Sequence, residues 1–541
     1  MYISLVGPKL QGYQKLEEVG PQERPLVVAG AGIFIGGQQW LSGSLQVQWE
    51  DSLVHKLWLD GLALTSIPDA IGMTLGGLLS TGSDGWSFID DMDSAGTPFE
   101  GSSNTISSSV LGFRYIDGMG QLREAWKNST DNEFQAFGVS LGLAGIIYEV
   151  ILSPVDAYCI QLSCINTVAS VCPKQEAVRG QWHGFLRSGI DKYDTQQGFK
   201  KTLWKASKSP ETGEIVCGEQ PSLGNQTYHD NSFPVIFFEH PYSMTSFDFI
   251  TEIVSLALRW LSQESCQSID DLCGETTIRR YLEGRLGVLP ETLGEEHLLA
   301  FEGCARSLVE QKRLKALGQR PSWQKEWWDK TMLMECYGKV MDHFGLSSDE
   351  EQQGVYRYYE GAFLHRAVHF HPQHNMEVYF PLEDNSKSGE EILCLIESFM
   401  EEEGHDRAGQ QVDYYFSKTN DDFWMSPENG KSPMGGNATN TYTPGEVLRV
   451  NIYTHWVVLS QDKHTKFELF LEHFNSQNLT YTLNWAKALP VNPRLLSRVL
   501  ENYPHLEEWK AFVRARDPHG VFLSDYWQKI FWADNSSSFL S

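Results

Sequence analysis

The chain has 541 residues, of which 41% are hydrophobic and 12% aromatic, enough for a globular protein with two domains or one large two-lobed unit. Its formal net charge of −27 argues against nucleic acids or anionic membrane surfaces as partners, because both would repel it. No apolar run approaches the roughly 20 residues that a membrane helix needs, so we expect no membrane span.

The chain carries nine cysteines, none of them in a Cys-x-x-Cys pair and none in the first 158 residues. An odd count without a pairing pattern favours free, mostly buried thiols over a disulfide framework. The first residues lack the charged and apolar regions of a secretory signal, which favours a cytoplasmic protein. The alternative is a secreted protein whose N-terminus is incomplete in this sequence, because five N-glycosylation sequons occur, at Asn128, Asn225, Asn437, Asn478 and Asn535.

The first predicted strand belongs to the glycine-rich run Pro25-Leu-Val-Val-Ala-Gly-Ala-Gly-Ile-Phe-Ile-Gly-Gly37, and we expect a short helix to follow at Gln38–Leu41. A Rossmann dinucleotide fingerprint is the less favoured interpretation of this run. Its glycines have the wrong spacing, and no acidic residue follows about 20 positions later in a clear βαβ unit.

Two glycine-dense bends, Thr74–Gly85 and Ser140–Ile147, bracket a predicted strand and a turn at Asp117–Gly120. Glycine lets the backbone approach a bound group closely, and successive N–H groups can hold an anion such as a diphosphate without a lysine. Each bend alone is also typical of an ordinary loop in an α/β protein. The run Ile146–Leu152 is rich in β-branched residues and predicts a strand.

Pro154 marks a candidate domain boundary, after which the pattern becomes mixed up to about residue 350. The run Phe249–Leu261 has helical periodicity and predicts a helix on the face of a sheet. Further along we expect a strand at Met376–Glu383, a helix from Ser388 to Met400 with Ser388 as N-cap, and strands over 411–416 and 447–456.

Several segments resemble a known family when they are taken together. Leu62-Ala-Leu, Ile67-Pro-Asp and the two bends resemble the FAD-binding domain of the vanillyl-alcohol-oxidase (PCMH-type) flavoproteins, closest to the D-arabinono-1,4-lactone oxidase (sugar or sterol oxidase) branch. Three later segments resemble the same branch: Phe423-Trp-Met-Ser-Pro427 with Arg449-Val-Asn451, Asn484-Trp-Ala-Lys487, and Arg514–Trp527. These segments follow one another in the same order as in the family, and this order is more specific than any single segment.

The sequence departs from the family at four places. Asp84 and Asn484 stand where the family has histidine, and Asn451 stands where it has aspartate. The family's first lobe, with its diphosphate loop and covalently bonded histidine, is not recognisable in residues 1–60. The resemblance therefore implies an FAD that is held without a covalent bond.

The fold implied by the resemblance is α+β. It comprises an N-terminally truncated PCMH-type FAD-binding domain (1–154), an α/β substrate (cap) domain with an antiparallel sheet covered by helices (155–480), and a C-terminal segment (481–541) that returns to the flavin domain. The implied cofactor-binding residues are Gly76, Gly77, Ser80, Thr81, Gly82, Gly85, Ser140, Gly142, Gly145 and Ile147.

The implied activity is an FAD-dependent oxidase that acts on the CH–OH group of a polyol, sugar lactone or related alcohol, with O2 as acceptor and hydrogen peroxide as product. The implied catalytic residues are Glu377 as base, Arg449 and Lys487 as cations, and Asn484 at the position of the family's histidine. The alternative is a catalytically impaired flavin-fold protein that binds a small ligand or a partner. A surface ion pair or a solvated strand face would explain the same charged residues.

Four histidines at 365, 369, 371 and 374 lie close together in the sequence. His369 and His371 would share one face of a strand, as a transition-metal site requires. Pro372 interrupts that strand, and no further ligand follows at a recognised spacing. We therefore interpret these histidines as surface residues and expect no metal.

Overall fold

The computed structural model of the chain describes residues 10–19, 25–36, 38–41, 45–47, 49–64, 67–68, 73–82, 106–167, 184–187, 196–210, 212–217, 354–357, 373–402, 411–418, 423–428, 446–455 and 463–532. The predicted helix at Phe249–Leu261 and the three histidines at 365, 369 and 371 lie outside these residues, as does the side chain of His374.

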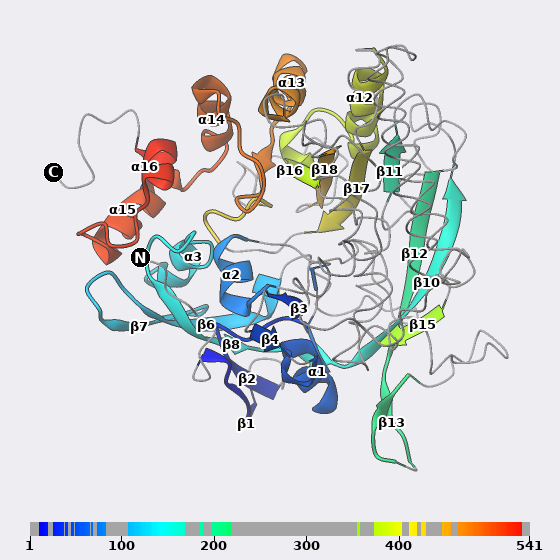
Figure 1. Cartoon of the computed structure of the whole chain (residues 1–541), viewed down its shortest axis with the longest axis vertical. Helices are drawn as coiled ribbons and strands as arrows, with labels where there is room; N and C mark the ends of the chain where they lie inside the picture. Colours follow the sequence, from blue (N-terminus) through cyan, green and yellow to red (C-terminus); the bar gives the residue numbers. More distant parts are fainter. Residues whose placement is uncertain are drawn as a thin grey trace, which may run out of the picture.

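A five-stranded antiparallel sheet forms the base of the first half of the molecule (Figure 1). Its central strand is the predicted run at 146–152, and the predicted turn at Asp117–Gly120 joins its last two strands. The order is β1 (Tyr13–Val19), β2 (Pro25–Gly30), β8 (Ile146–Leu152), β6 (Val110–Ile116) and β7 (Leu122–Trp126).

Short helices pack their apolar residues into one core with this sheet. They are α1 (Leu53–Leu59), α2 (Leu75–Ser80) and α3 (Glu133–Phe137). Ser52 and Thr74 begin α1 and α2 as N-caps, each accepting a backbone N–H three residues on. The 3₁₀ turns Trp49–Asp51 and Ile106–Ser109 precede α1 and β6, and β5 (Leu62–Ala63) pairs with β9 (Val155–Asp156) beyond the end of β8.

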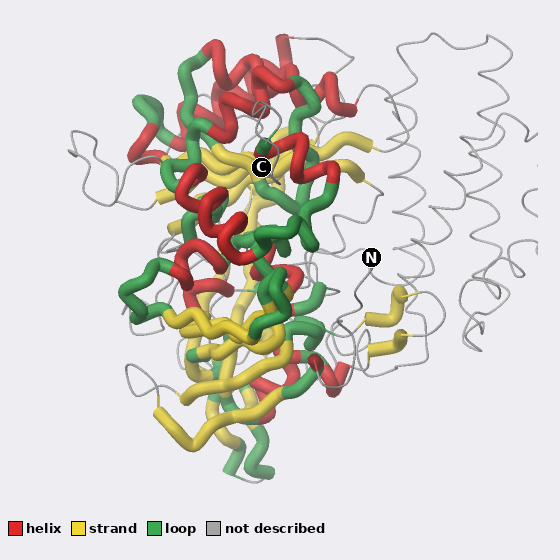
Figure 2. The backbone as a smooth tube through the Cα atoms, turned by 90° about the vertical axis from the view of Figure 1, so that its left-hand side faces the viewer, coloured by secondary structure: helices red, strands yellow, loops and turns green. Residues whose placement is uncertain are grey.

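A second five-stranded antiparallel sheet forms the upper half of the described chain in Figure 1. Its order is β11 (Gly184–Arg187), β17 (Gln411–Lys418), β18 (Glu446–His455), β16 (Gln373–Pro381) and β19 (Thr482–Leu483). Figure 2 shows helices above this sheet; α12 (Gly389–Glu402) and α13 (Lys463–Ser476) supply apolar side chains to the core that includes its strands. The prediction of an α+β fold with an antiparallel sheet covered by helices is confirmed.

The helix predicted to begin at Ser388 is α12, and its start is a capping box. Ser388 Oγ accepts the N–H of Glu391 at 3.1 Å, while Glu391 Oε2 accepts the N–H of Ser388 at 2.7 Å. The predicted strands at 376–383, 411–416 and 447–456 correspond to β16, β17 and β18, and the 3₁₀ turn Leu382–Asp384 follows β16.

A third sheet and two hairpins contain the other strands of the described residues. The three-stranded sheet has the order β12 (Gln196–Lys205), β10 (Tyr158–Thr167), β15 (Gly354–Arg357), and the hairpin of β13 (Ser207–Lys208) and β14 (Ile215–Val216) follows β12. The second hairpin pairs β3 (Gln38–Leu41) with β4 (Leu45–Val47), so the short helix expected at Gln38–Leu41 is wrong. Four residues are too few for an independent helix, whereas pairing with β4 gives their backbone groups partners.

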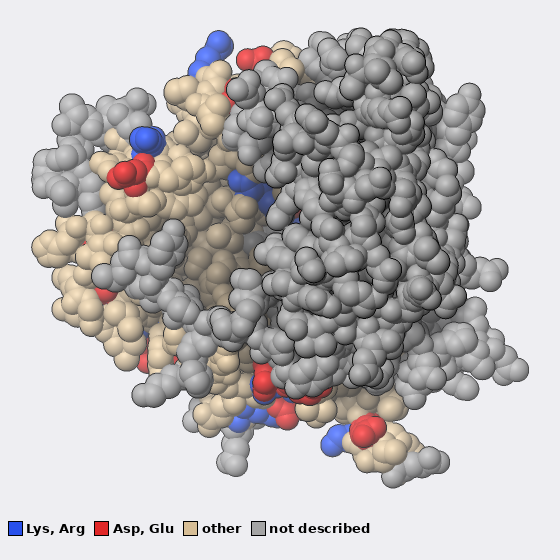
Figure 3. Space-filling model, viewed as in Figure 1, with Lys and Arg blue, Asp and Glu red and all other residues tan. Residues whose placement is uncertain are grey.

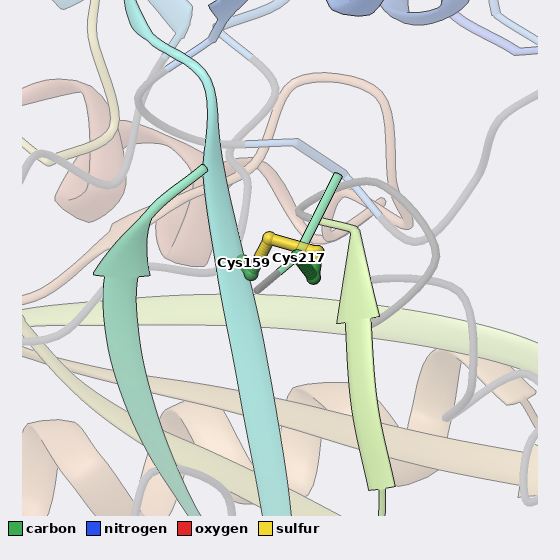
Figure 4. The surroundings of a disulfide bond; sticks show 2 residues. All are labelled: Cys159 and Cys217. Carbon is green, nitrogen blue, oxygen red and sulfur yellow. A yellow bond between two sulfur atoms is a disulfide. The ribbon is translucent and has the colours of Figure 1, made fainter. Parts of the chain in front are cut away.

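The expectation of free thiols throughout is also wrong, because Cys159 and Cys217 form a disulfide with Cα atoms 5.8 Å apart (Figure 4). The bond ties the start of β10 to the residue that follows β14, and both cysteines are buried. Cys394 on α12 is also disulfide-bonded. The spacing in the sequence does not reveal the pairing, because the two partners are 58 residues apart and meet only once the hairpin has folded back.

Of the last three helices, the first packs against α13 and β19, and the second ends against the first half of the molecule. They are α14 (Pro493–Leu500), α15 (Leu506–Arg516) and α16 (Asp525–Phe531). Arg516 forms an ion pair with Glu133 at 2.8 Å and donates to Tyr115 Oη at 3.0 Å. The N–H of Gly118 donates to the carbonyl of Arg516 at 2.9 Å, so the end of α15 is fixed to the β6–β7 turn.

Candidate functional site

The two glycine-dense bends are in direct contact. The N–H of Leu141 donates to the carbonyl of Ser80 at 2.9 Å, so the end of α2 touches the loop that leads into β8. Gly82 has φ = +63°, and a Cβ there would lie 3.2 Å from Val139 Cγ2. The chain therefore brings the bends to one place although they are some 60 residues apart.

The amides of α2 already have acceptors inside the chain. Gly76 donates its N–H to Ala31 at 2.8 Å, and Gly77 donates to the hydroxyl of Thr74. The hydroxyls of Ser80 and Thr81 donate to the carbonyls of Gly76 and Gly77. These groups can line a ligand by close approach, but their protons already have acceptors within the chain.

The second bend has the more available groups. Ser140 is fully buried, and its hydroxyl oxygen has no hydrogen-bond partner. Gly142 has φ = +72° and faces open space, since a Cβ there would meet no atom within 4 Å. A buried hydroxyl without a partner is costly unless a bound group engages it, so Ser140 and Gly142 fit a polar ligand at this bend.

Gly145 and Ile147 have packing roles instead. A Cβ on Gly145 would lie 2.6 Å from the carbonyl oxygen of Ile116 and 2.7 Å from the ring of Tyr115. Ile147 is buried and paired with Tyr115 in the sheet. Gly85 lies outside the described residues.

The second part of the site is a polar stripe on one face of the β16–β18 sheet. Glu377 and Tyr379 on β16 lie opposite Asn451 and Arg449 on β18, because strand side chains alternate between faces. The residues between them, such as Val378, point to the other face and belong to the helix-covered core. The stripe is buried even so: Glu377 is 2% exposed and Arg449 is 7% exposed.

Glu377 is held by two donors. Its Oε1 accepts from Arg449 Nε at 2.5 Å, and its Oε2 accepts from Asn484 Nδ2 at 2.7 Å. Asn484 is also 3.2 Å from Tyr379 Oη and follows β19 directly. An amide at this position can donate to the carboxylate but cannot titrate, unlike the histidine of the resembled family.

Two tyrosine rings enclose the Arg449 guanidinium, whose central carbon lies 4.9 Å from the ring centre of Tyr415 and 5.9 Å from that of Tyr379. Tyr415 is the β17 partner of Arg449. Such contacts stabilise a cation that is largely removed from water. The site thus compensates its buried charge with one carboxylate and two aromatic faces.

Lys487 does not join this network. Its side chain is exposed, and its N–H donates to the carbonyl of Asn484 in the turn that follows β19. Of the four catalytic candidates, the structure brings together Glu377, Arg449 and Asn484 and leaves Lys487 at the surface. The sequence motif places the lysine only three residues from Asn484, which fixes the distance along the chain but not the direction of the side chain.

Residues 423–428 connect the two parts of the site. Pro427 lies against Gly82, and the N–H of Trp424 donates to the carbonyl of Gln135. On the other side, the carbonyl of Pro427 accepts from the hydroxyl of Thr482, and the carbonyl of Met425 accepts from Trp485 Nε1 at 2.8 Å. We call residues 423–428 the linking segment.

The space-filling view shows a hollow in this face of the molecule, between the upper and lower halves of the described chain (Figure 3). Lys or Arg atoms are visible inside the hollow.

Among the described residues, no group of three or more His, Cys, Asp or Glu side chains could hold a metal ion. No helix in the described part of the chain combines the length and apolar character required to cross a membrane.

The sequence reasoning missed Tyr379, Tyr415 and Thr482. The first two could have been found from strand alternation, since Tyr379 is two residues after Glu377 and Tyr415 is in a strand predicted to lie in the same sheet. Thr482 contacts Pro427, 55 residues away, and no local pattern indicates that pairing.

Comparisons with known proteins give a fold but no family. No protein-family model and no curated protein matches the chain. A solved structure described as a solvent-stable cholesterol oxidase has a TM-score of 0.57 at 12% identity and covers 96% of this chain and 84% of its own.

Two structures of cholesterol oxidase from Brevibacterium sterolicum, one of them a histidine-to-alanine mutant, each have a TM-score of 0.52 at 13% identity, with coverage of 96% and 83%. The chain therefore has the fold of these cholesterol oxidases.

Proposed function

We propose that this protein is an FAD-dependent oxidoreductase that oxidises a CH–OH group of a polyol, sugar lactone or related alcohol and uses O2 as acceptor. The main support for the proposal is that one segment, residues 423–428, connects the two glycine-dense bends with the buried polar network. Thr482 and Trp485, which flank Asn484 of the buried network, both donate hydrogen bonds to carbonyls of residues 423–428, and Gly82 of the first bend lies against Pro427 of the same segment. The fold shared with oxidases of an alcohol, cholesterol, supports the same class of activity.

The residues that would hold FAD are those of the two bends. Ser140 and Gly142 have an unpartnered hydroxyl and an open backbone face, while Gly82, Ser80 and Thr81 lie where the first bend meets the second. Bound there, FAD would supply the acceptor for a hydride from the substrate carbon. The described residues fit a non-covalent cofactor held by backbone and hydroxyl groups.

The buried network provides proton transfer and charge stabilisation. Glu377 Oε2 is the carboxylate oxygen that would take the proton of the substrate hydroxyl, and Asn484 holds that oxygen in place. Arg449 compensates the carboxylate and would stabilise negative charge that develops on the substrate oxygen. Tyr415 and Tyr379 fix the guanidinium and keep water from it.

The chemistry of the stripe favours a hydroxylated substrate. The face carries a carboxylate, a guanidinium, two amides and two phenols within a few strand positions. A compact polyol or lactone can satisfy several of these groups at once, whereas a sterol offers one hydroxyl and an apolar body. Groups left unpaired would lower the affinity for the sterol.

The test is the purified full chain incubated with FAD and separated from free flavin. We expect a yellow protein whose flavin absorbance bleaches without oxygen when the right polyol or lactone is added, and peroxide release when oxygen is admitted. Cholesterol serves as the comparison substrate. A protein that retains FAD but is bleached by no alcohol indicates the binding-only alternative, and a protein that takes up no FAD overturns the proposal.

Ser140→Ala tests the cofactor position separately. Removing an unpartnered buried hydroxyl should leave the cofactor-free protein as stable or slightly more stable, yet it should weaken FAD binding by about 2- to 10-fold, the value of one hydrogen bond. Ser52→Ala is the control, because Ser52 is equally buried but caps α1. It should lower thermal stability without changing FAD affinity; equal FAD affinity in the wild type and Ser140→Ala would contradict the placement.

A further inference from the structure

The disulfides change the interpretation of the sequons. Cys159 pairs with Cys217, and Cys394 is disulfide-bonded as well. Disulfides form and persist in oxidising compartments and are rare in the cytosol. The same compartments hold the enzymes that attach oligosaccharides to Asn-x-Ser/Thr, so exposed sequons of this chain are candidate attachment sites.

Two of the five sequons lie in the described part of the chain, and both have an exposed asparagine. Asn128 follows β7 by two residues, in the sequence Asn128-Ser-Thr130. Asn478 follows α13 in a turn with φ = +55°, in the sequence Asn478-Leu-Thr480. An oligosaccharide is bulky and hydrophilic and requires such an exposed position outside regular structure.

Neither position conflicts with the site described above. Asn128 lies in the first half of the molecule, just after β7, which is an edge strand of its sheet. Asn478 lies on the helix-covered side of the second sheet, because α13 covers the face opposite to the Glu377 stripe. Substituents at both places would leave the polar stripe and the bends accessible.

We propose that Asn128 and Asn478 are N-glycosylation sites and that this chain acquires its disulfides and its oligosaccharides in the same oxidising secretory compartment. The bond formed joins the side-chain amide nitrogen of each asparagine to the first sugar, which a lipid-linked oligosaccharide donates with its diphosphate as leaving group. Neither modification requires the proposed oxidase activity.

The test is expression of the full chain in a eukaryotic host with a cleavable secretion leader, followed by peptide mass spectrometry before and after peptide-N-glycosidase. We expect glycopeptides at both asparagines and one step of lost mass on a gel for each of Asn128→Gln and Asn478→Gln. Thr130→Ala should remove the oligosaccharide from Asn128 while keeping the asparagine itself.

Asn132 is a matched internal control. It is exposed, has φ = +56° like Asn478, and lies four residues after Asn128, but it is followed by Glu-Phe and forms no sequon. It should remain unmodified. If Asn128 or Asn478 is found unmodified, the proposal for that asparagine is overturned. If Cys159 and Cys217 react with a thiol reagent before reduction, the assignment of the compartment is overturned.

Discussion

At the scale of single residues, Glu377 and Arg449 form a buried ion pair at the centre of the proposed site. Two opposite charges removed from water stay favourable only with good geometry and further partners, and both are present here. A buried pair of this kind adds little net stability compared with apolar residues. Its position in a buried face therefore supports the proposed role in proton transfer more than a role in stability.

Glu377→Gln separates the two roles. It leaves the Arg449 charge buried without a carboxylate, so we expect a loss of about 3–5 kcal/mol in the free energy of unfolding. Removing the proposed base should also reduce kcat by at least ~100-fold. Chemical unfolding and the turnover assay measure the two effects.

The double variant Glu377→Gln/Arg449→Met is the matched comparison. Without the guanidinium no charge is stranded, so most of the stability should return while turnover stays low. Turnover that recovers together with stability would show a purely structural role for the pair. Glu124→Gln is a control, because Glu124 forms an exposed ion pair with Arg114. It should change neither the free energy of unfolding nor turnover.

At the scale of elements, local chemistry made some segments predictable. Ser388 with Glu391 begins α12, and the β-branched run at 146–152 forms β8. The strand Gln38–Leu41 was not predictable, because the partner that it has among the described residues is another short strand. Likewise, the sequence around Gly145 does not reveal that its missing Cβ serves packing against Ile116 and not a ligand.

The contact between α3 and the linking segment gives a second prediction. Gly138 ends α3, and a Cβ there would overlap the ring of Phe423, which packs against Phe113 and Phe134. Gly138→Ala should therefore displace the linking segment, lower the free energy of unfolding by about 1–3 kcal/mol and weaken cofactor binding. Gly12→Ala is the control, since a Cβ at Gly12 meets no atom within 4 Å.

The β6–β7 turn predicts a dependence on pH. Burial of Asp117 opposes its ionisation, but hydrogen bonds from the N–H groups of Gln121 and Met119 and from Arg123 outweigh it and hold the pKa of this carboxyl below its usual range. The unfolded chain then binds the proton more readily than the folded chain. The stabilisation is therefore complete above the ordinary value of about 3.9 and disappears as the pH falls through the lower folded value.

Unfolding titrations of Asp117→Asn at several pH values check this expectation. The variant should be less stable than the wild type at pH 7, and the difference should shrink as the pH is lowered below about 4. A difference that is constant over this range would mean that the turn depends on shape and not on the charge of Asp117.

At the scale of the whole molecule, the disulfide between Cys159 and Cys217 closes a long loop where the first half passes into β10. Such a bond restricts the unfolded chain, so we expect Cys159→Ala/Cys217→Ala to lower the free energy of unfolding by about 2–4 kcal/mol. A reductant should then destabilise the wild type more than this variant. Equal sensitivity would assign the redox effect to other cysteines.

At this scale the sequence predicted the fold class, but it did not predict which distant residues meet around the site. The order of short motifs indicated that Glu377 and Arg449 lie on strands of the substrate domain, but it assigned Asn484 to the C-terminal segment 481–541. The structure instead joins Asn484 to Glu377. The contacts between Gly82 and Pro427, or between Gly118 and Asp517, join residues several hundred positions apart. They depend on how the halves dock, which no short pattern encodes.

The chain crosses between its two halves at several points, through β8 to β10, through residues 423–428 and through the end of α15. Exchanging one half with a distant homologue at a single breakpoint near residue 154 would therefore cut through shared packing and produce an insoluble hybrid. A functional chimera would have to inherit the linking segment and the tail from the same parent as residues 1–154. Engineering of the proposed substrate site is accordingly better directed at side chains of the β16–β18 face than at modular recombination.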